Sequence, residues 1–307
     1  MIKINRKYLG IFYIIVSAFC FALMNTFVRL SGDIPTVQKS FFRNLIALMF
    51  AFILLKKNKV EIKWHKGNLK FHFIRSIAGT IGILCNFYAV DHMVLSDASM
   101  LNKMSPFFAI IFSLIFLKEK VSLTQVIIVI SAFLGSLFII KPTFIGMEFF
   151  PAVIGFLGGM GAGAAYTTVR YLGQNGENGT FIVFFFSLFS CLVTLPYLLI
   201  NFHSMTIVQM IYLICAGLTA AAGQFSITAA YRCSPAKEIS VYDYTQIIFS
   251  AILGLIIFQQ IPDMYSIIGY IIIIISAVIM FVLNNRNRDN YNLHRIYLYE
   301  MDMIYLR

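Results

Sequence analysis

Ten apolar runs, each close to the length that a helix needs to cross a membrane, follow one another along this chain. A spanning helix takes about 20 predominantly apolar residues, and in lipid a helix satisfies all its own backbone hydrogen bonds. The runs cover residues 8–30, 37–55, 71–90, 97–117, 121–140, 149–172, 179–200, 207–231, 238–258 and 264–283. We therefore predict an all-α integral membrane protein with ten transmembrane helices.

The composition agrees with a lipid bilayer as the surroundings of this chain. Hydrophobic residues make up 60% of the sequence and charged residues only 12%, whereas about 25% of a soluble domain is charged. The net charge of +11 comes from basic residues in the short loops between apolar runs. This placement orients helices in a membrane, so we expect no nucleic-acid partner.

A constant offset of 141 residues relates the two halves of the chain. The segment 86–120 returns as 227–261, with Asp97 on Glu238, Asn102 on Asp243 and Glu119 on Gln260. Such an internal duplication in an apolar chain is typical of a transporter built from repeats. We expect a five-helix repeat over residues 8–140, a second over 149–283, and a cytoplasmic tail over 284–307.

The basic residues predict the orientation of the helices. With the N-terminus in the cytoplasm, 17 of the 24 Lys and Arg residues fall on the inner side: Lys3, Arg6, Lys7, Lys56, Lys57, Lys59, Lys63, Lys66, Lys70, Lys118, Lys120, Arg232, Lys237, Arg286, Arg288, Arg295 and Arg307. The outer loops and their edges hold only Lys39 and Lys141. Both termini are then cytoplasmic. Since each repeat has an odd number of spans, the second repeat must enter the membrane inverted.

Two further stretches, FFRNLIAL in the second span and LNKMSPFFAIIFSLIFLKEK at the fourth, resemble the drug/metabolite transporter superfamily, EamA type. The resemblance covers nearly all of residues 8–283. It implies two five-helix repeats around a central cavity lined by the first, third, fourth, sixth, eighth and ninth spans. Arg43, Pro106 and Glu119 match common positions of the family. Gln260 stands where the family often has a glutamate, and we expect this change to affect helix capping or a surface pair.

Two cations within the apolar spans are candidates for binding an anionic group such as a carboxylate. Charged groups are costly in hydrocarbon, so each is a candidate functional site. Arg43 and Lys103 each lie about six residues into a span that starts outside, roughly 9 Å below the outer surface. Arg43 can instead be a structural tie to backbone carbonyls. Lys103 lies in the duplicated segment beside Asn102, which is a further candidate.

Several uncharged polar side chains are candidates for the substrate pathway. They are Asn25, Asn86, Tyr88, Tyr166, Gln224, Tyr242 and Gln246. Tyr242 and Gln246 are four residues apart and share one face of a helix, which suits a small amphipathic or cationic solute. The alternatives are an interhelical hydrogen bond for Asn25 and simple aromatic packing for the Tyr242 face.

Asp243 is the one carboxylate that we place well inside a span. From its position it lies roughly 8 Å from the inner face, and Lys103 lies roughly 9 Å from the outer face. Across about 30 Å of hydrocarbon this leaves roughly 13 Å between them in depth, which argues against a direct salt bridge unless a helix shift closes the gap. Asp243 is then a candidate proton-coupling group, a counter-charge for a cationic substrate, or a carboxylate bonded to neighbouring tyrosines.

No catalytic, nucleotide-binding or metal-binding motif is present, so we expect neither an enzyme nor a cofactor. The sequence predicts a multi-pass inner-membrane carrier. It moves a small metabolite, an amino acid or related solute or a drug-like compound, by alternating access. We expect export, with protons as a candidate coupling ion. A receptor or scaffold without transport and a membrane-embedded enzyme are the alternatives. A channel would not need two inverted halves.

Overall fold

A computed structural model describes residues 6–60, 67–116, 122–140, 149–234, 239, 242–276 and 278–283. Within these residues all regular secondary structure is helical. The labelled helices are α1 (Arg6–Leu30), α2 (Thr36–Lys57), α3 (Leu69–His92), α4 (Leu95–Asn102), α5 (Ser105–Phe116), α6 (Leu123–Ile140), α7 (Phe149–Gln174), α8 (Gly179–Ile200), α9 (Ile207–Cys233) and α11 (Thr245–Phe258). A further apolar helix, Met264–Leu283, follows α11. The predicted tail, residues 284–307, lies outside the described residues.

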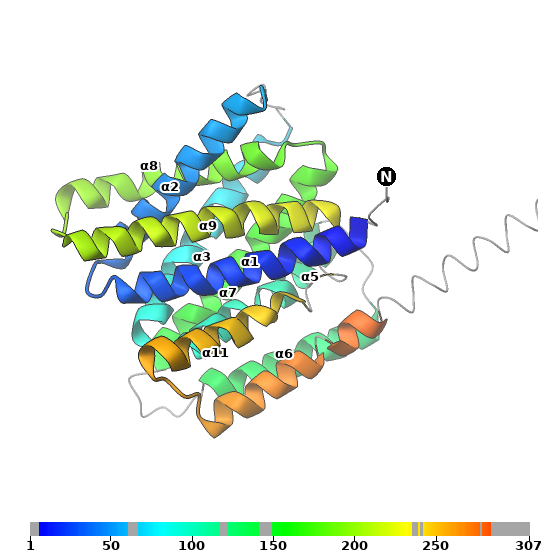
Figure 1. The fold of residues 1–307 in the computed structure, drawn as a ribbon. Coiled ribbons are helices and arrows are strands. Elements are labelled where there is room, and N and C mark those ends of the chain that lie inside the picture. The colour runs from blue at the N-terminus through cyan, green and yellow to red at the C-terminus, as the bar shows by residue number, and fades with distance from the viewer. Residues whose placement is uncertain are drawn as a thin grey trace, which may run out of the picture.

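The predicted membrane segments all have helical counterparts. Eight helices within the described residues are long and apolar enough to cross a membrane, one of them being α4 and α5 taken together. The predicted segments 121–140 and 238–258 correspond to shorter apolar helices, α6 and α11. Figure 1 shows the helices lying side by side, with the first described residues and the end of Met264–Leu283 at the same end of the bundle. The prediction of an all-α membrane protein is therefore confirmed.

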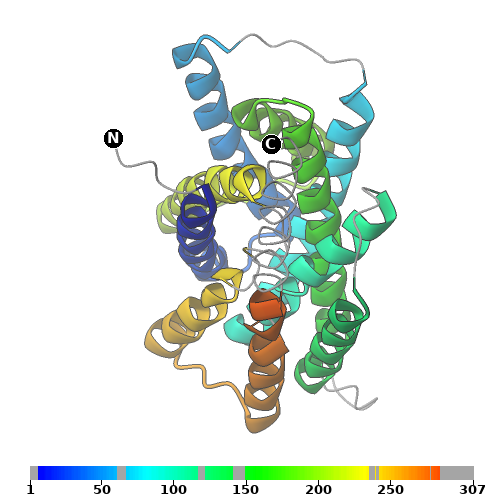
Figure 2. The same cartoon turned by 90° about the vertical axis from the view of Figure 1, so that its right-hand side faces the viewer.

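The two repeats pack against each other in pairs that follow the 141-residue offset. Helix α1 lies against α9, and its repeat equivalent α7 lies against α3. Helix α5 lies against α7 as its equivalent α11 lies against α1, and α2 packs against its own equivalent, α8. Helix α6 likewise packs against its own equivalent, Met264–Leu283, because a Cβ on Gly135 would touch Ile272 and Ile273. Figure 2 shows α2 at one edge of the molecule and Met264–Leu283 at the opposite edge.

Equivalent helices run in opposite directions. Gln38, at the start of α2, exchanges two hydrogen bonds of 2.8 and 2.9 Å with the backbone of His203, just beyond the end of α8. The start of one helix therefore lies beside the end of its equivalent, as an inverted repeat requires. Which end of the bundle faces the cytoplasm stays a prediction from the basic residues.

The duplication extends to single hydrogen bonds. Arg29 donates from Nη1 to the carbonyl of Val90 at 3.4 Å, and Arg170 donates from Nη1 to the carbonyl of Tyr231 at 3.4 Å. Both pairs are separated by 61 residues and differ from each other by 141. Each arginine thus binds a carbonyl in the last turn of a neighbouring helix, where the helix dipole favours a cation.

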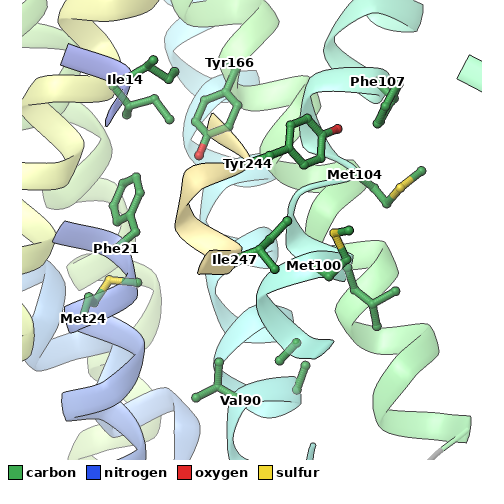
Figure 3. Close-up of a cluster of buried hydrophobic side chains, with 14 of the residues drawn as sticks. Ile14, Phe21, Met24, Val90, Met100, Met104, Phe107, Tyr166, Tyr244 and Ile247 are labelled. Atoms are coloured by element: carbon green, nitrogen blue, oxygen red, sulfur yellow. The ribbon is translucent and has the colours of Figure 1, made fainter. Parts of the chain in front are cut away.

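The fourth predicted span is broken into α4 and α5, and the ninth is broken at the equivalent place. Lys103 ends α4 with ψ near 5°, and Tyr244 precedes α11 with ψ of −14°. Positions 103 and 244 differ by 141. Figure 3 shows Met100, Met104 and Phe107 of the first broken segment beside Tyr244 and Ile247 of the second. Both repeats therefore carry a helix break near the centre of the protein.

Gln260 caps the broken helix α4. Its Oε1 accepts a hydrogen bond from the backbone N–H of Leu95 at 3.2 Å. The first N–H groups of a helix have no partner within the helix, so this contact satisfies one of them. The contact agrees with helix capping, one of the two expected roles of position 260, and the effect of the change from glutamate stays a prediction.

Glycines let α3 and α7 approach closely. A Cβ on Gly82 would lie 3.1 Å from the backbone nitrogen of Ala162, and one on Gly161 would lie 2.8 Å from the carbonyl oxygen of Ala78. Small residues at such contacts are typical of membrane helix pairs. On another face of α7, a Cβ on Gly159 would touch the carbonyl of Leu101, so that face holds α4. Gly159 and Gly161 are therefore packing residues of α7.

Candidate functional site

The described residues surround a cavity between the two repeats. Its empty volume is about 500 Å³, which includes space open to solvent. Its polar lining is Asn25 of α1, Arg43 of α2, Arg75 and Asn86 of α3, Asn102 of α4, Tyr166 of α7, Gln224 of α9 and Gln246 of α11, and α8 adds Phe186. The predicted lining helices are therefore all present. The second and seventh spans, α2 and α8, line the cavity as well.

Seven of the eleven residues that we selected from the sequence line this cavity. They are Asn25, Arg43, Asn86, Asn102, Tyr166, Gln224 and Gln246. Four do not: Tyr88, Lys103, Tyr242 and Asp243. Tyr88 stacks on His92 at 4.1 Å near the end of α3. A role for any of these residues in transport remains a prediction.

Tyr242 and Gln246 do not present one common face to the cavity. Tyr242 is half-buried and packs edge-to-face on Phe281, with ring centroids 5.3 Å apart. Gln246 lines the cavity. The expectation was wrong because it assumed a continuous helix, and the chain turns at Tyr244 before α11 begins. The aromatic surface next to Gln246 comes instead from Tyr166, which stacks on Tyr231 at 5.0 Å.

Lys103 and Asp243 form a direct ion pair, contrary to the depth argument. Lys103 Nζ lies 2.6 Å from Asp243 Oδ1, and the side chains are 1% and 0% exposed. The depth argument assumed two continuous helices, whereas α4 ends before Lys103 and α11 begins only after Tyr244. The breaks at Lys103 and Tyr244 are also equivalent, so the chain around them meets near the axis that relates the repeats. Lys103 is therefore neutralised, and it does not pair with Arg43 around the cavity.

Asp243 is not the only buried carboxylate of the spans. Asp97, at 5% exposure, accepts a hydrogen bond of 2.6 Å from the hydroxyl of Tyr270. Lys39, which we assigned to the edge of an outer loop, is buried and lies 2.7 Å from Asp91. The burial of these two side chains was not predicted, because a linear reading does not give the rotation of a helix about its axis.

Among the polar residues that line the described cavity, Arg75 is the one that we did not select from the sequence. It lies in the third apolar span and is 2% exposed, so a lone arginine within an apolar run was the available signal. Its guanidinium carbon lies 4.0 Å from the ring centroid of Phe186, and that of Arg43 lies 5.8 Å from the same centroid. Two buried cations thus flank the ring of one phenylalanine.

The hydrogen-bond partners of Arg43 among the described residues are side-chain amides. Its Nη1 donates to Asn44 Oδ1 at 2.6 Å, and its Nη2 lies 3.5 Å from Gln224 Oε1. Its Nε has no partner. The expected alternative, a tie to backbone carbonyls, is not formed with any residue that the structure describes. Asn44 is held in turn by Ser190 of α8 at 2.8 Å, so this network fixes the arginine between α2 and α9.

A pair of asparagines spans the cavity wall between α1 and α3. Asn86 donates from Nδ2 to Asn25 Oδ1 at 3.1 Å, so Asn25 forms an interhelical hydrogen bond and also lines the cavity. The remaining amide atoms, Asn25 Nδ2 and Asn86 Oδ1, have no hydrogen-bond partner in the described structure. Gln246 Oε1 also has no hydrogen-bond partner in the described structure. Buried polar atoms usually have partners, so these groups are suited to a polar ligand.

Among the residues that the structure describes, no three His, Cys, Asp or Glu side chains are grouped closely enough to hold a metal ion.

Comparison with known proteins gives matches along almost the whole chain. Residues 8–141 and 150–282 each match the EamA-like transporter family. The pseudopaline exporter CntI of Pseudomonas aeruginosa is 29% identical over 272 residues, 88% of this chain and 94% of that protein. Human solute carrier family 35 member G1 is 26% identical over 294 residues, covering 88% of this chain and 78% of its own length. The riboflavin transporter of Vibrio cholerae is 23% identical over 277 residues, covering 87% and 91%.

Among the solved structures that match is a crystal structure of similar fold. It superposes with a TM-score of 0.67 over 91% of this chain and 97% of its own length, at 12% sequence identity. At this identity the likeness concerns the fold alone.

Proposed function

The chain belongs to the EamA-like transporter family, and we propose that it is a secondary transporter that exports a small metabolite across the inner membrane by alternating access. A multi-pass membrane protein is indicated by its apolar helices. The family and the named relatives are transporters and not enzymes. Of the alternatives that the sequence left open, the experiment below tests a receptor or scaffold without transport.

One observation carries the proposal: a polar cavity lies where the two inverted repeats meet, and helices from both repeats line it. In transporters with inverted repeats the substrate site lies at the repeat interface, and one half rocks against the other around it. The equivalent breaks at Lys103 and Tyr244 lie close to this cavity. In such transporters, discontinuous helices typically form the substrate and coupling-ion sites at the interface between the repeats.

The direction and the membrane belong to the proposal as well. An outward direction is supported by the likeness to a protein named as an exporter. The inner membrane and the cytoplasmic termini are supported by the bias of Lys and Arg toward one set of loops.

We propose protons as the coupling ion, with Asp243 as the group that carries them. Asp243 Oδ1 accepts from Lys103, and Oδ2 has no partner in the described structure. Its surroundings include the tyrosines 166, 231 and 244. Protonation of this carboxylate would release Lys103 at the helix breaks and so couple a proton to a change of conformation. In Asp243→Asn the amide oxygen still accepts from Lys103, but no proton is exchanged.

The test is transport by the purified protein in lipid vesicles. Candidate substrates come first from a thermal-shift screen, since a bound ligand stabilises the protein by mass action. We expect counterflow of a stabilising compound in wild type, its loss in Asn86→Leu, and normal counterflow in the matched variant Asn175→Leu, which lies on an exposed turn. Absence of counterflow for every stabilising compound would identify a receptor or scaffold.

Coupling is tested in the same vesicles. With protons as the coupling ion, Asp243→Asn abolishes uptake driven by a pH gradient and retains substrate exchange. If Asp243 only balances the charge of a cationic substrate, both modes fall together. Unchanged transport in both modes would remove Asp243 from the mechanism.

A further inference from the structure

We propose that Arg43 and Arg75 together form the binding site for an acidic group of the substrate, and that the substrate is therefore a carboxylate-bearing metabolite. This inference deepens the proposed function and rests on it. The Lys103–Asp243 pair is not part of this site, because its charges satisfy each other.

Arg43 and Arg75 have no counter-charge among the described residues. Arg43 and Arg75 are 1% and 2% exposed, and neither forms an ion pair with any described carboxylate. None of the described residues that line the cavity is acidic. A buried charge is paired in nearly all proteins, because leaving water is costly. Two adjacent unpaired guanidinium groups repel each other as well, so an anion between them would relieve both costs.

The contacts that Arg75 and Arg43 already make leave hydrogen-bond donors on both side chains. Arg75 forms no hydrogen bond to the described residues, and its contact with the Phe186 ring at 4.0 Å replaces only a small part of its lost hydration. Arg43 is held by Asn44, which leaves its Nε without a partner in the described structure. Guanidinium groups bind carboxylates through paired N–H donors. Donors are therefore available on both side chains.

Helix α3 leaves space for the guanidinium of Arg75. Gly79 lies one turn further along α3, and a Cβ there would collide with Arg75 Nη1 and with the Phe186 ring. The side chain thus lies along the cavity wall over a glycine. A larger residue at position 79 would displace the cation without removing its charge.

The remaining lining suits a metabolite with further polar groups. Asn25, Asn86 and Gln246 offer amide atoms that have no partner in the described structure. Tyr166 and Phe21 offer aromatic surface. A ligand whose acidic group lies between the arginines would reach these amides with hydroxyl, amino or carbonyl groups.

Anion-dependent stabilisation of the purified protein tests the site with simple probes of known charge. The probes are a panel of amino acids and di- and tricarboxylic acids, inorganic phosphate, and succinamide as the neutral match of succinate. We expect at least one carboxylate to raise the melting temperature, and succinamide to leave it unchanged. Arg75→Gln and Arg43→Gln should each weaken that binding about tenfold to a hundredfold, as expected for a lost charged hydrogen bond. Arg170→Gln, a cation outside the cavity, should bind as wild type.

Stability without ligand separates a binding role from a structural one. If the arginines are held for an anion, Arg75→Gln melts at the same or a higher temperature than wild type. Arg75→Lys keeps the charge but loses the paired donors, so it should bind more weakly than wild type. Gly79→Ala should weaken binding with Arg75 still present.

Several outcomes would overturn the proposal. Failure of Arg75→Gln and Arg43→Gln to fold, or a marked fall in their melting temperatures, would make the arginines structural. Stabilisation by phosphate alone would refute the carboxylate assignment, and so would the absence of any stabilising anion. The anion site and the proposed function can fail separately. Transport of a neutral solute that is unaffected by Arg75→Gln would leave transport intact and remove the anion site. Anion binding without counterflow would keep the site and remove transport.

Discussion

The buried pair Lys103–Asp243 allows a quantitative prediction. Lys103→Met leaves the Asp243 carboxylate without its partner, and Asp243→Leu does the same to the ammonium. Both side chains are almost fully buried and their charged atoms lie 2.6 Å apart. Removal of one partner from such a pair costs about 3–5 kcal/mol, because the other charge stays buried. The double variant buries no charge at this place, so we expect it to be far less destabilised than the sum of the single variants.

The measurement is a double-mutant cycle on unfolding in mixed detergent micelles, with the free energy of unfolding as the readout. We expect a coupling energy of about 3 kcal/mol or more between positions 103 and 243. The pair Lys39–Asp91 is the matched control, with a similar distance of 2.7 Å but an 18% exposed carboxylate. Its coupling should be smaller, because solvent screens a partly exposed charge.

Additive costs at positions 103 and 243 would refute the reasoning. They would mean that the two charges do not interact, and the side chains would then belong to separate environments as the depth estimate had suggested. Single variants within about 0.5 kcal/mol of wild type would refute it as well, since a surface position shows changes of that size.

Two further predictions concern the orientation and the packing of the bundle. In a background without the native cysteines, Ser204→Cys should react with an impermeant thiol reagent from outside and Asn175→Cys should not; both positions are exposed. The opposite pattern would reverse the assigned orientation. Gly161→Ala should destabilise the protein by about 1–3 kcal/mol, because the added Cβ would lie 2.8 Å from the carbonyl oxygen of Ala78. Gly67→Ala, with open space around it, should change the stability little. If both substitutions lowered the melting temperature equally, the close approach of α3 and α7 would be contradicted.

The cavity was only partly predictable. Asn25, Asn86 and Gln224 could be selected from the sequence because an amide in an apolar span is costly and therefore rarely placed without a partner or ligand. Arg75 met the same criterion but was not selected, since the sequence gives no rotation of a helix about its axis. The structure turns Arg75 toward Phe186 and the cavity, and turns Lys39 toward Asp91.

The sequence by itself determined the membrane-protein class, the two repeats and their inversion. These properties depend on the length of apolar runs and on a count of spans, which are linear quantities. Tertiary structure alone decided that Lys103 meets Asp243 and that the second cation near Arg43 is Arg75 and not Lys103, since both arginines contact the Phe186 ring. The depth estimate treated each span as one straight helix, whereas both helices break, at Lys103 and at Tyr244. A break changes the direction of the chain, so the position of a side chain in space no longer follows from its count along the span.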